Sequence, residues 1–441
     1  MNKALLKQKL SQHYNTDNWK EILEYIFPNV ALFQIPQDIL VTNEKVKTFR
    51  QLGNVRLNDG KTLAVFDIQL KDNVDIARNR VELRNLTTKY IDQEATHGVL
   101  AVFASDSEDY RFTFTAQETE FDENMQLVTK QTEPKRYTYV LGPNESCQTA
   151  SDRFFKLHEQ KNTVELENVV DAFSVEKLNK EFFNKYKEHY EDFVQFITGK
   201  RFKKVSGKWK EVEIHEPSGY LETVFENDNK QARDFVKKLI GRMVFVQFLQ
   251  KKGWMGCSVD SSEWGNGDHT FCKSLFESAN QDQFHSNYLA HLFDALNTSN
   301  RENDVFDLTQ TRVPYLNGGL FEADSEAIRQ IDFPGSHFES LLNFFGEYNF
   351  TIDENDPNDH EVGIDPEMLG HIFENLLEDN KDKGAFYTPK PIVQYMCQES
   401  LIQYLKTHLE NETTDIENFI RTFDKGDESD PNNYILQNDK W

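Results

Sequence analysis

The chain has 441 residues, of which 28% are charged and 38% are hydrophobic, and it contains only 12 prolines. This length and composition allow two or three folded domains and exclude a disordered chain. The net charge of −25 excludes a protein that coats itself uniformly in nucleic acid, because phosphate binding requires local positive charge.

The sequence also bounds the location of the protein. Residues 1–7 are typical of an amphipathic helix and lack the apolar core of a signal peptide. The longest apolar stretch, residues 239–249, is interrupted by Gly241, Arg242 and Gln247, so we expect no membrane partner. The four cysteines lie far apart without metal-ligand spacing and are expected to be reduced thiols. We therefore expect a cytoplasmic protein.

Residues 1–160 have the pattern of an α/β domain. A helical opening to about residue 26 precedes a strand at 61–71, a polar-faced helix at 75–93, and strands at 98–104, 110–115 and 137–141. A turn at 142–144 and a helix to about residue 157 close this unit.

Residues 161–350 are predicted to be mostly helical. An aromatic-rich helix covers 173–198 and a second long helix covers 228–252. A loop at 253–267 and a turn at 313–322 follow, and further helices reach residue 348.

Between these two long helices lies a basic run. Residues 200–210 hold six cations and no acid, with Phe202 and Trp209 interleaved. This pattern favours contact with a DNA backbone, and the candidate residues are Lys200, Arg201, Lys203, Lys204 and Lys208. The alternative is a solvated helix end and hairpin.

Two helices are predicted near the end of the chain. The first begins at Asp365 as N-cap with Pro366 at N1, and the second begins at Thr388-Pro389. The apolar positions of the second predict an inner face formed by Val393, Met396, Cys397, Leu401, Tyr404 and Leu405. The acids Glu361 and Asp365 have no evident partners in the sequence and are expected at the surface.

The loop between these helices, residues 384–389, presents two aromatic side chains and a Thr cap at a helix N-terminus. Such a terminus favours a negatively charged group, and an aromatic ring can lie against a cationic or apolar ligand part. The alternative is a capped helix start with two core aromatics.

Several stretches together resemble adenine-specific DNA methyltransferases of the single-chain restriction–modification (type IIG) kind. They are residues 241–254, 315–322, 348–350 with 365–367, 369–377 and 383–393. The resemblance implies that the loop at Phe386, Tyr387, Thr388 and Pro389 helps to bind the methionine end of S-adenosylmethionine. It also implies double-stranded DNA as a partner and a nuclease position for the N-terminal domain.

The sequence departs from the family pattern after this loop. The family's glycine-rich cofactor loop and its Asn-Pro-Pro-Tyr loop, which holds the flipped adenine, do not occur here. Asp430-Pro431-Asn432-Asn433-Tyr434 is only superficially similar and is expected to be a turn. We therefore expect that this chain alone does not methylate DNA and that a second polypeptide supplies the rest or the chain is a truncated remnant.

The resemblance also directs attention to the strand at 61–71. Nucleases of this architecture place an Asp and a Glu-x-Lys on adjacent strands, where carboxylates hold Mg²⁺ and the Lys assists the attacking water. Asp59, Gln69 and Lys71 fit this spacing, with Gln in place of Glu. Alternation places Asp67, Gln69 and Lys71 on one face of the strand. The alternative is a half-exposed strand with polar residues facing outward.

The predicted fold is an α/β nuclease-like domain (residues 1–160), a mainly α-helical connector (161–350), and the first helices of a Rossmann-like methyltransferase domain (351–441), giving a helix-rich α+β chain. The expected function is adenine-N6 DNA methylation in a restriction–modification system. The alternatives are a non-enzymatic DNA- or protein-binding remnant and an Mg²⁺-dependent DNA endonuclease.

Overall fold

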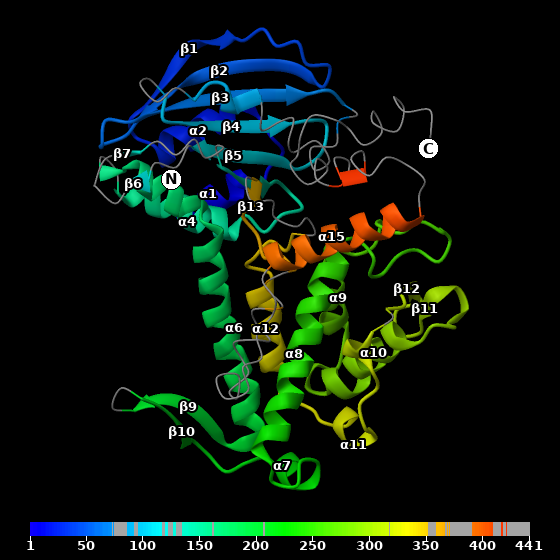
Figure 1. Ribbon diagram of the computed structural model, residues 1–441. Coiled ribbons are helices and arrows are strands. Elements are labelled where there is room, and N and C mark those ends of the chain that lie inside the picture. Colours follow the sequence, from blue (N-terminus) through cyan, green and yellow to red (C-terminus); the bar gives the residue numbers. More distant parts are fainter. Residues whose placement is uncertain are drawn as a thin grey trace.

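The computed structural model describes residues 1–72, 74, 86–91, 96–116, 120–121, 127–128, 135–160, 163–205, 208–316, 318–351, 359–366, 368, 370, 390–408, 416–417 and 420. These residues form one large β-sheet with long helices beside it (Figure 1). The prediction of a mixed, helix-rich α+β chain is therefore confirmed.

The large sheet has seven strands in the order β1-β2-β3-β4-β5-β8-β13. Strands β3 and β4 are parallel, as are β8 and β13, and all other neighbours are antiparallel. The strands are β1 (Val30–Asp38), β2 (Val46–Arg56), β3 (Thr62–Leu70), β4 (Gly98–Ala104), β5 (Tyr110–Ala116), β8 (Lys135–Leu141) and β13 (Asp359–Glu361). A separate small hairpin pairs β6 (Glu120–Phe121) with β7 (Leu127–Val128).

The predicted strands at 61–71, 98–104, 110–115 and 137–141 correspond to β3, β4, β5 and β8. Strands β1 and β2 were not predicted. Most side chains of β1 are exposed or half-buried, since it forms the edge of the sheet, and its sequence lacks the apolar alternation that marks a strand.

The two faces of the sheet have separate cores. Leu63 and Val65 of β3 pack on the helical side, whereas Phe66, Ile68 and Leu70 belong to a second, smaller cluster on the opposite face. The helical side is covered by α1 (Lys3–Leu10), α2 (Thr16–Ile26), α4 (Gln148–Gln160) and α5 (Leu166–Phe173). The alternation predicted for β3 is therefore confirmed.

The helical part is built on α6 (Val175–Thr198) and α8 (Asn229–Lys251), which agree with the helices predicted at 173–198 and 228–252. The Ser174 hydroxyl caps α6 by accepting the Lys177 N–H at 3.2 Å, and Asp228 caps α8. Gly199 ends α6 with a φ of +70°, and a Cβ there would lie 2.2 Å from the carbonyl oxygen of His215.

Shorter elements complete this part. They are hairpins β9–β10 (Lys200–Val205 and Lys208–Glu213) and β11–β12 (Val305–Phe306 and Thr311–Arg312), and helices α7 (Gly219–Thr223), α9 (Phe271–Ser278), α10 (Ala290–Asn297), α11 (Glu326–Arg329) and α12 (Gly335–Phe345). One continuous hydrophobic cluster extends from the sheet through α6, α8 and α12.

The chain returns to the sheet at residues 359–361, where β13 adds to the far side of β8. Glu361 of β13 forms an ion pair with Arg111 of β5, with Nη1 and Oε2 3.2 Å apart. Glu361 and Asp365 are only 5% and 6% exposed, so the expectation that they lie at the surface is wrong. Their partners come from distant segments or from backbone N–H groups, which the sequence does not reveal. The domain boundaries at 160 and 350 stay predictions.

The two C-terminal helices give a mixed result. The predicted N-cap at Asp365 is confirmed, since its Oδ1 accepts the Met368 N–H at 3.1 Å. Helix α15 (Lys390–His408) exists, but its predicted inner face is wrong: Val393, Met396, Leu401 and Tyr404 are 43–60% exposed. Helical spacing predicts where apolar side chains gather, not whether another element covers them. Most of the helix predicted at 75–93 lies outside the described residues.

Candidate functional site

The first candidate group lies on β3, where Asp67 and Gln69 share a face. Gln69 Nε2 donates to Asp67 Oδ1 at 2.6 Å. Asp67 Oδ2 accepts from Arg50 Nη2 at 2.6 Å and from the Thr16 hydroxyl at 3.1 Å. The burial of Tyr14 raises the pKa of its hydroxyl well above the ordinary value, and the negative charge of Asp67 is the second cause of this rise. Asp67 is therefore a fully buried carboxylate whose two oxygens both have partners.

Asp59 lies far from this group. It sits in the turn before β3, whereas Gln69 and Lys71 lie at the other end of this nine-residue strand, about 25 Å away at roughly 3.3 Å per residue. Asp59 Oδ1 accepts the Lys61 N–H and Oδ2 accepts the Leu166 N–H, both at 3.2 Å. The structure thus places Asp67, not Asp59, with Gln69. The period-two alternation of β3 had placed Asp67 and Gln69 on one face, although Asp67 was not among the predicted catalytic residues.

This donor set does not fit Mg²⁺. Gln69 supplies a neutral amide whose nitrogen already donates to Asp67, and Arg50 neutralises the one carboxylate. Within the part of the chain that the structure describes, no three His, Cys, Asp or Glu side chains are arranged to hold a metal ion. Geometry and chemistry together argue against a working metal site on β3.

The second candidate group lies at the same edge of the sheet, where the carboxyl ends of β3, β4 and β8 meet. Ligands of open α/β sheets bind outside this edge. Here the loops after β4 and β8 bring Asp109 beside Asn144, whose backbone N–H and side-chain amide both donate to the carboxylate at 3.1 Å. Gly142 permits this approach, since a Cβ there would lie 2.4 Å from Asp109 Oδ1.

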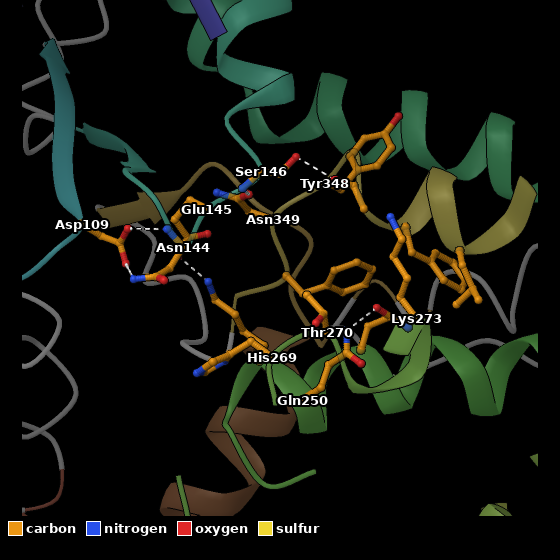
Figure 2. A pocket seen from close by; sticks show the side chains of 16 residues that line it. Asp109, Asn144, Glu145, Ser146, Gln250, His269, Thr270, Lys273, Tyr348 and Asn349 are labelled. Atoms are coloured by element: carbon orange, nitrogen blue, oxygen red, sulfur yellow. Dashed lines mark hydrogen bonds and ion pairs between the residues drawn. The ribbon is translucent and has the colours of Figure 1, made fainter. Parts of the chain in front are cut away.

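A cavity of about 380 Å³ separates these loops from the helical part (Figure 2). We call it the edge cavity. Its sheet side is formed by Asp109, Asn144 and Glu145, and its helical side by the end of α8, residues 269–273 and residues 342–350. The segments that enclose it come from between residues 109 and 350, a span of more than 200 residues of the sequence.

The loop after β8 is tied directly to the segment after α12. The Ser146 N–H donates to Asn349 Oδ1 at 3.0 Å, and the Ser146 hydroxyl donates to the Gly346 carbonyl at 2.8 Å. Asn349 in turn donates to the Val140 carbonyl at 3.2 Å. The two bonds of Ser146 join residues that line the edge cavity, and all three bonds hold this part of its wall in place.

Glu145 and Lys251, which both line the edge cavity, form an ion pair. The Glu145 side chain is only 8% exposed. Burial raises the pKa of Glu145 to about 7, and the nearby Lys251 ammonium opposes that rise. A carboxyl group that titrates near neutral pH inside a cavity is a common feature of functional sites.

The basic run forms the β9–β10 hairpin, which is fastened to the helices by a buried ion network. Arg233 of α8 lies 3.2 Å from both Glu191 of α6 and Glu211 of β10, and its guanidinium stacks 4.5 Å above the Phe202 ring. Glu191 also accepts the Phe202 N–H at 3.2 Å. The hairpin is therefore held in a fixed position on α6 and α8.

The predicted cations of this run differ in whether an acid pairs with them and in how exposed they are. Arg201 pairs with Asp192. Lys203 lies directly opposite Lys210, and both are exposed. The backbones of Lys200, Lys204 and Lys208 lie in the two strands, and the side chains of the latter two lie outside the described residues. Lys210 belongs to the same surface but was not among the predicted candidates.

Two of the stretches that carry the family resemblance meet in space. Arg242 of α8, 2% exposed, donates to the carbonyls of Leu320 at 2.7 Å and Glu322 at 2.6 Å. It also pairs with Asp324 at 2.5 Å. Although burial acts to raise the pKa of Asp324, its bonds to Lys238 and Arg242 lower it. Arg242 thus fixes the loop at 315–322 against α8.

Phe386, Tyr387, Thr388 and Pro389, the predicted cofactor-binding residues, lie outside the described residues. No helix in the described part of the chain is long and apolar enough to cross a membrane.

Comparison with known proteins shows a partial similarity. The chain is 26% identical over 189 residues to a protein of Methanocaldococcus jannaschii described as a "Putative type II restriction enzyme and methyltransferase". The match covers 38% of this chain and 14% of the length of that protein. No protein-family model matches the chain. No solved structure matches it either.

Proposed function

We propose that this chain is part of a restriction–modification system that acts on double-stranded DNA. In this proposal it carries the opening of a site-specific, S-adenosylmethionine-dependent adenine-N6 methyltransferase, preceded by an α/β domain in the nuclease position. The similarity to the Methanocaldococcus jannaschii protein is the observation that carries the proposal.

Two features of the chain support it. The stretches that resemble the methyltransferase family occur in the family's order, and Arg242 joins two of them through buried hydrogen bonds. The protein has a net charge of −25, yet its β9–β10 hairpin presents Lys203 and Lys210 side by side. A fixed basic surface on an acidic protein suits contact with phosphates at one place only.

The proposed roles follow from these positions. The β9–β10 hairpin contacts the DNA backbone. The loop at Phe386, Tyr387, Thr388 and Pro389 holds the methionine end of S-adenosylmethionine, whose methyl group is the one transferred to adenine. The α/β domain does not cleave DNA through β3, because the Asp67 carboxylate is neutralised by Arg50 and Gln69 is not an acid.

Equilibrium binding of S-adenosylmethionine to the purified chain tests the cofactor part of the proposal. Replacing Tyr387 with Ala is expected to weaken binding by about tenfold, the effect of losing one ring contact of roughly 1–2 kcal/mol with a cation. Tyr395→Ala, on the exposed surface of α15, is the matched control and should leave binding unchanged. Equal binding by Tyr387→Ala and the unchanged chain would contradict the cofactor role.

A further inference from the structure

We propose that the edge cavity is a binding site for a nucleoside monophosphate, with the base on the cavity floor and the phosphate at its rim. This inference stands on the cavity alone and does not depend on the proposed function. The volume of about 380 Å³ lies within the range of small-molecule sites, and the carboxyl edge of the sheet is where such sites occur.

The floor of the edge cavity suits a flat heteroaromatic ring. Phe345, Tyr348 and Phe350 line it and are 1%, 8% and 6% exposed, so the floor is rigid and largely apolar. Because so little of each ring is exposed, a flat base on this floor gains apolar contact with the rings rather than full face-to-face stacking.

Two buried amides supply hydrogen bonds to the edge of such a ring. Gln247 and Gln250 line the edge cavity and are 6% and 9% exposed. Gln250 donates to Gln247 Oε1 at 2.8 Å and accepts the Cys272 N–H at 3.1 Å. Gln247 Nε2 makes only a long contact, 3.5 Å, with the Met243 carbonyl. Each amide nitrogen carries two hydrogens, so donor capacity remains for a ring nitrogen or carbonyl.

The rim of the edge cavity suits an anion. Lys273 has a side chain that is 53% exposed and lies 3.9 Å from its nearest acid, Glu277, a distance too long for a hydrogen bond. His269 and Thr270 line the same side of the edge cavity (Figure 2), and the Thr270 hydroxyl donates to Asp268. On the opposite wall Glu145 is paired with Lys251, whereas Asp109 accepts hydrogen bonds from the neutral Asn144 and keeps its charge. A phosphate is therefore expected at the Lys273 side of the rim, away from Asp109.

Isothermal titration calorimetry of the full chain with purine and pyrimidine nucleoside monophosphates tests this inference. Inorganic phosphate and the matching nucleosides are titrated separately. We expect at least one monophosphate to bind about tenfold more tightly than its nucleoside, because a hydrogen bond between charged groups is stronger than one between neutral groups. Absence of binding by every monophosphate overturns the proposal.

Two variants locate the binding. Lys273→Ala should weaken the monophosphate about tenfold and leave the nucleoside unchanged, whereas Gln247→Leu should weaken both. Lys177→Ala is the matched control, because this lysine of α6 is 49% exposed and does not line the edge cavity. Monophosphate binding that persists unchanged in both Lys273→Ala and Gln247→Leu overturns the site assignment. Far-ultraviolet circular dichroism confirms that each variant is folded.

The monophosphate group has two sources, a free nucleotide or a nucleotide within a single strand. Competition by a short single-stranded oligonucleotide against a bound monophosphate distinguishes them: displacement identifies a strand, and no displacement identifies a free nucleotide. Duplex DNA binding is measured in parallel. If the chain binds a monophosphate but not duplex DNA, the proposed function is contradicted. If it binds duplex DNA but no monophosphate, this inference is contradicted.

Discussion

The carboxylate of Glu145, on the loop after β8, is paired with the ammonium of Lys251 at the end of α8. This pair joins the sheet to the helical part at the edge cavity. Both groups leave water to form it, the carboxylate almost completely. Because burial raises the pKa of Glu145 to about 7, the pair is fully charged only above neutral pH.

This relationship predicts a specific pH dependence. The folded chain binds a proton at Glu145 that the unfolded chain, with an ordinary pKa of 4.5, has released. The contribution of Glu145 to the free energy of unfolding should therefore fall by up to about 3 kcal/mol as pH rises from about 4.5 to 7. Above pH 7 it should stay constant. Glu145→Gln cannot titrate, so the stability difference between the two chains should change over this range. Urea unfolding at pH 5 and pH 8 measures it, and a constant difference contradicts the buried carboxyl.

Arg242 is predicted to be the most costly single replacement on α8. Arg242→Met leaves Asp324 and two carbonyls without this partner in a buried setting, and should destabilise the chain by about 3–5 kcal/mol. Lys238→Ala is the control, since Lys238 also pairs with Asp324 but is 36% exposed, and should cost under about 1 kcal/mol. Denaturant unfolding compares them. Similar losses for both variants would mean that Arg242 does not hold the loop at 315–322.

The β9–β10 hairpin is predicted to supply the backbone contacts to DNA. Removing two phosphate contacts with Lys203→Ala/Lys210→Ala should weaken duplex binding regardless of sequence and reduce the slope of log affinity against log salt by about two. Fluorescence anisotropy between low and moderate salt measures both quantities. Lys3→Ala/Lys177→Ala removes the same charge elsewhere and should leave the slope unchanged. Equal slopes for the two double variants would place the DNA contact elsewhere.

The group on β3 is predicted to bind Mg²⁺ only after a substitution. Gln69→Glu places a second carboxylate beside Asp67, and two adjacent carboxylates repel unless a cation or a proton lies between them. Millimolar Mg²⁺ should therefore raise the melting temperature of Gln69→Glu by a few degrees and leave the unchanged chain unaffected. Gln69→Ala is the control. An equal Mg²⁺ response in the unchanged chain would mean that the native group already holds the metal.

Helix α15 is predicted to expose the reactive thiol of the chain. Cys397 is exposed, whereas Cys147, Cys257 and Cys272 are buried. Burial also raises the pKa of Cys272 to about 12, which suppresses its thiolate. A disulfide reagent should react rapidly with one thiol in the native chain and with four after denaturation. Cys397→Ser should abolish the fast reaction, and a remaining fast thiol would contradict the exposure of α15.

Much of the local structure could be predicted from the sequence. Strands β3, β4, β5 and β8 and helices α6 and α8 have strong apolar periodicity or good caps, such as Ser174 and Asp228, so local physics sets their limits. Edge strand β1 and the distant strand β13 could not be predicted, since one lacks alternation and the other depends on pairing with β8, more than 200 residues earlier.

The candidate sites could be predicted less completely than the helices and strands, because tertiary contacts form them. Alternation placed Asp67 with Gln69, but only the fold shows that Arg50 from the neighbouring strand neutralises Asp67. The edge cavity could not be found from sequence, because Glu145, Lys251 and Asn349 come from three separate segments that share no motif. The basic run was recognisable from composition. Its attachment through Glu191 and Arg233 was not, because those residues lie on two different helices.

The most direct measurement of the central claim is the adenine methylation of the native host genome with and without this gene. If the chain is part of an adenine-N6 restriction–modification system, deletion should remove N6-methyladenine from one recognition sequence and leave methylation at other sequences unchanged. Restoring the gene should restore that methylation, and the Tyr387→Ala form should not. If every methylated sequence stays methylated after deletion, the proposed function is contradicted.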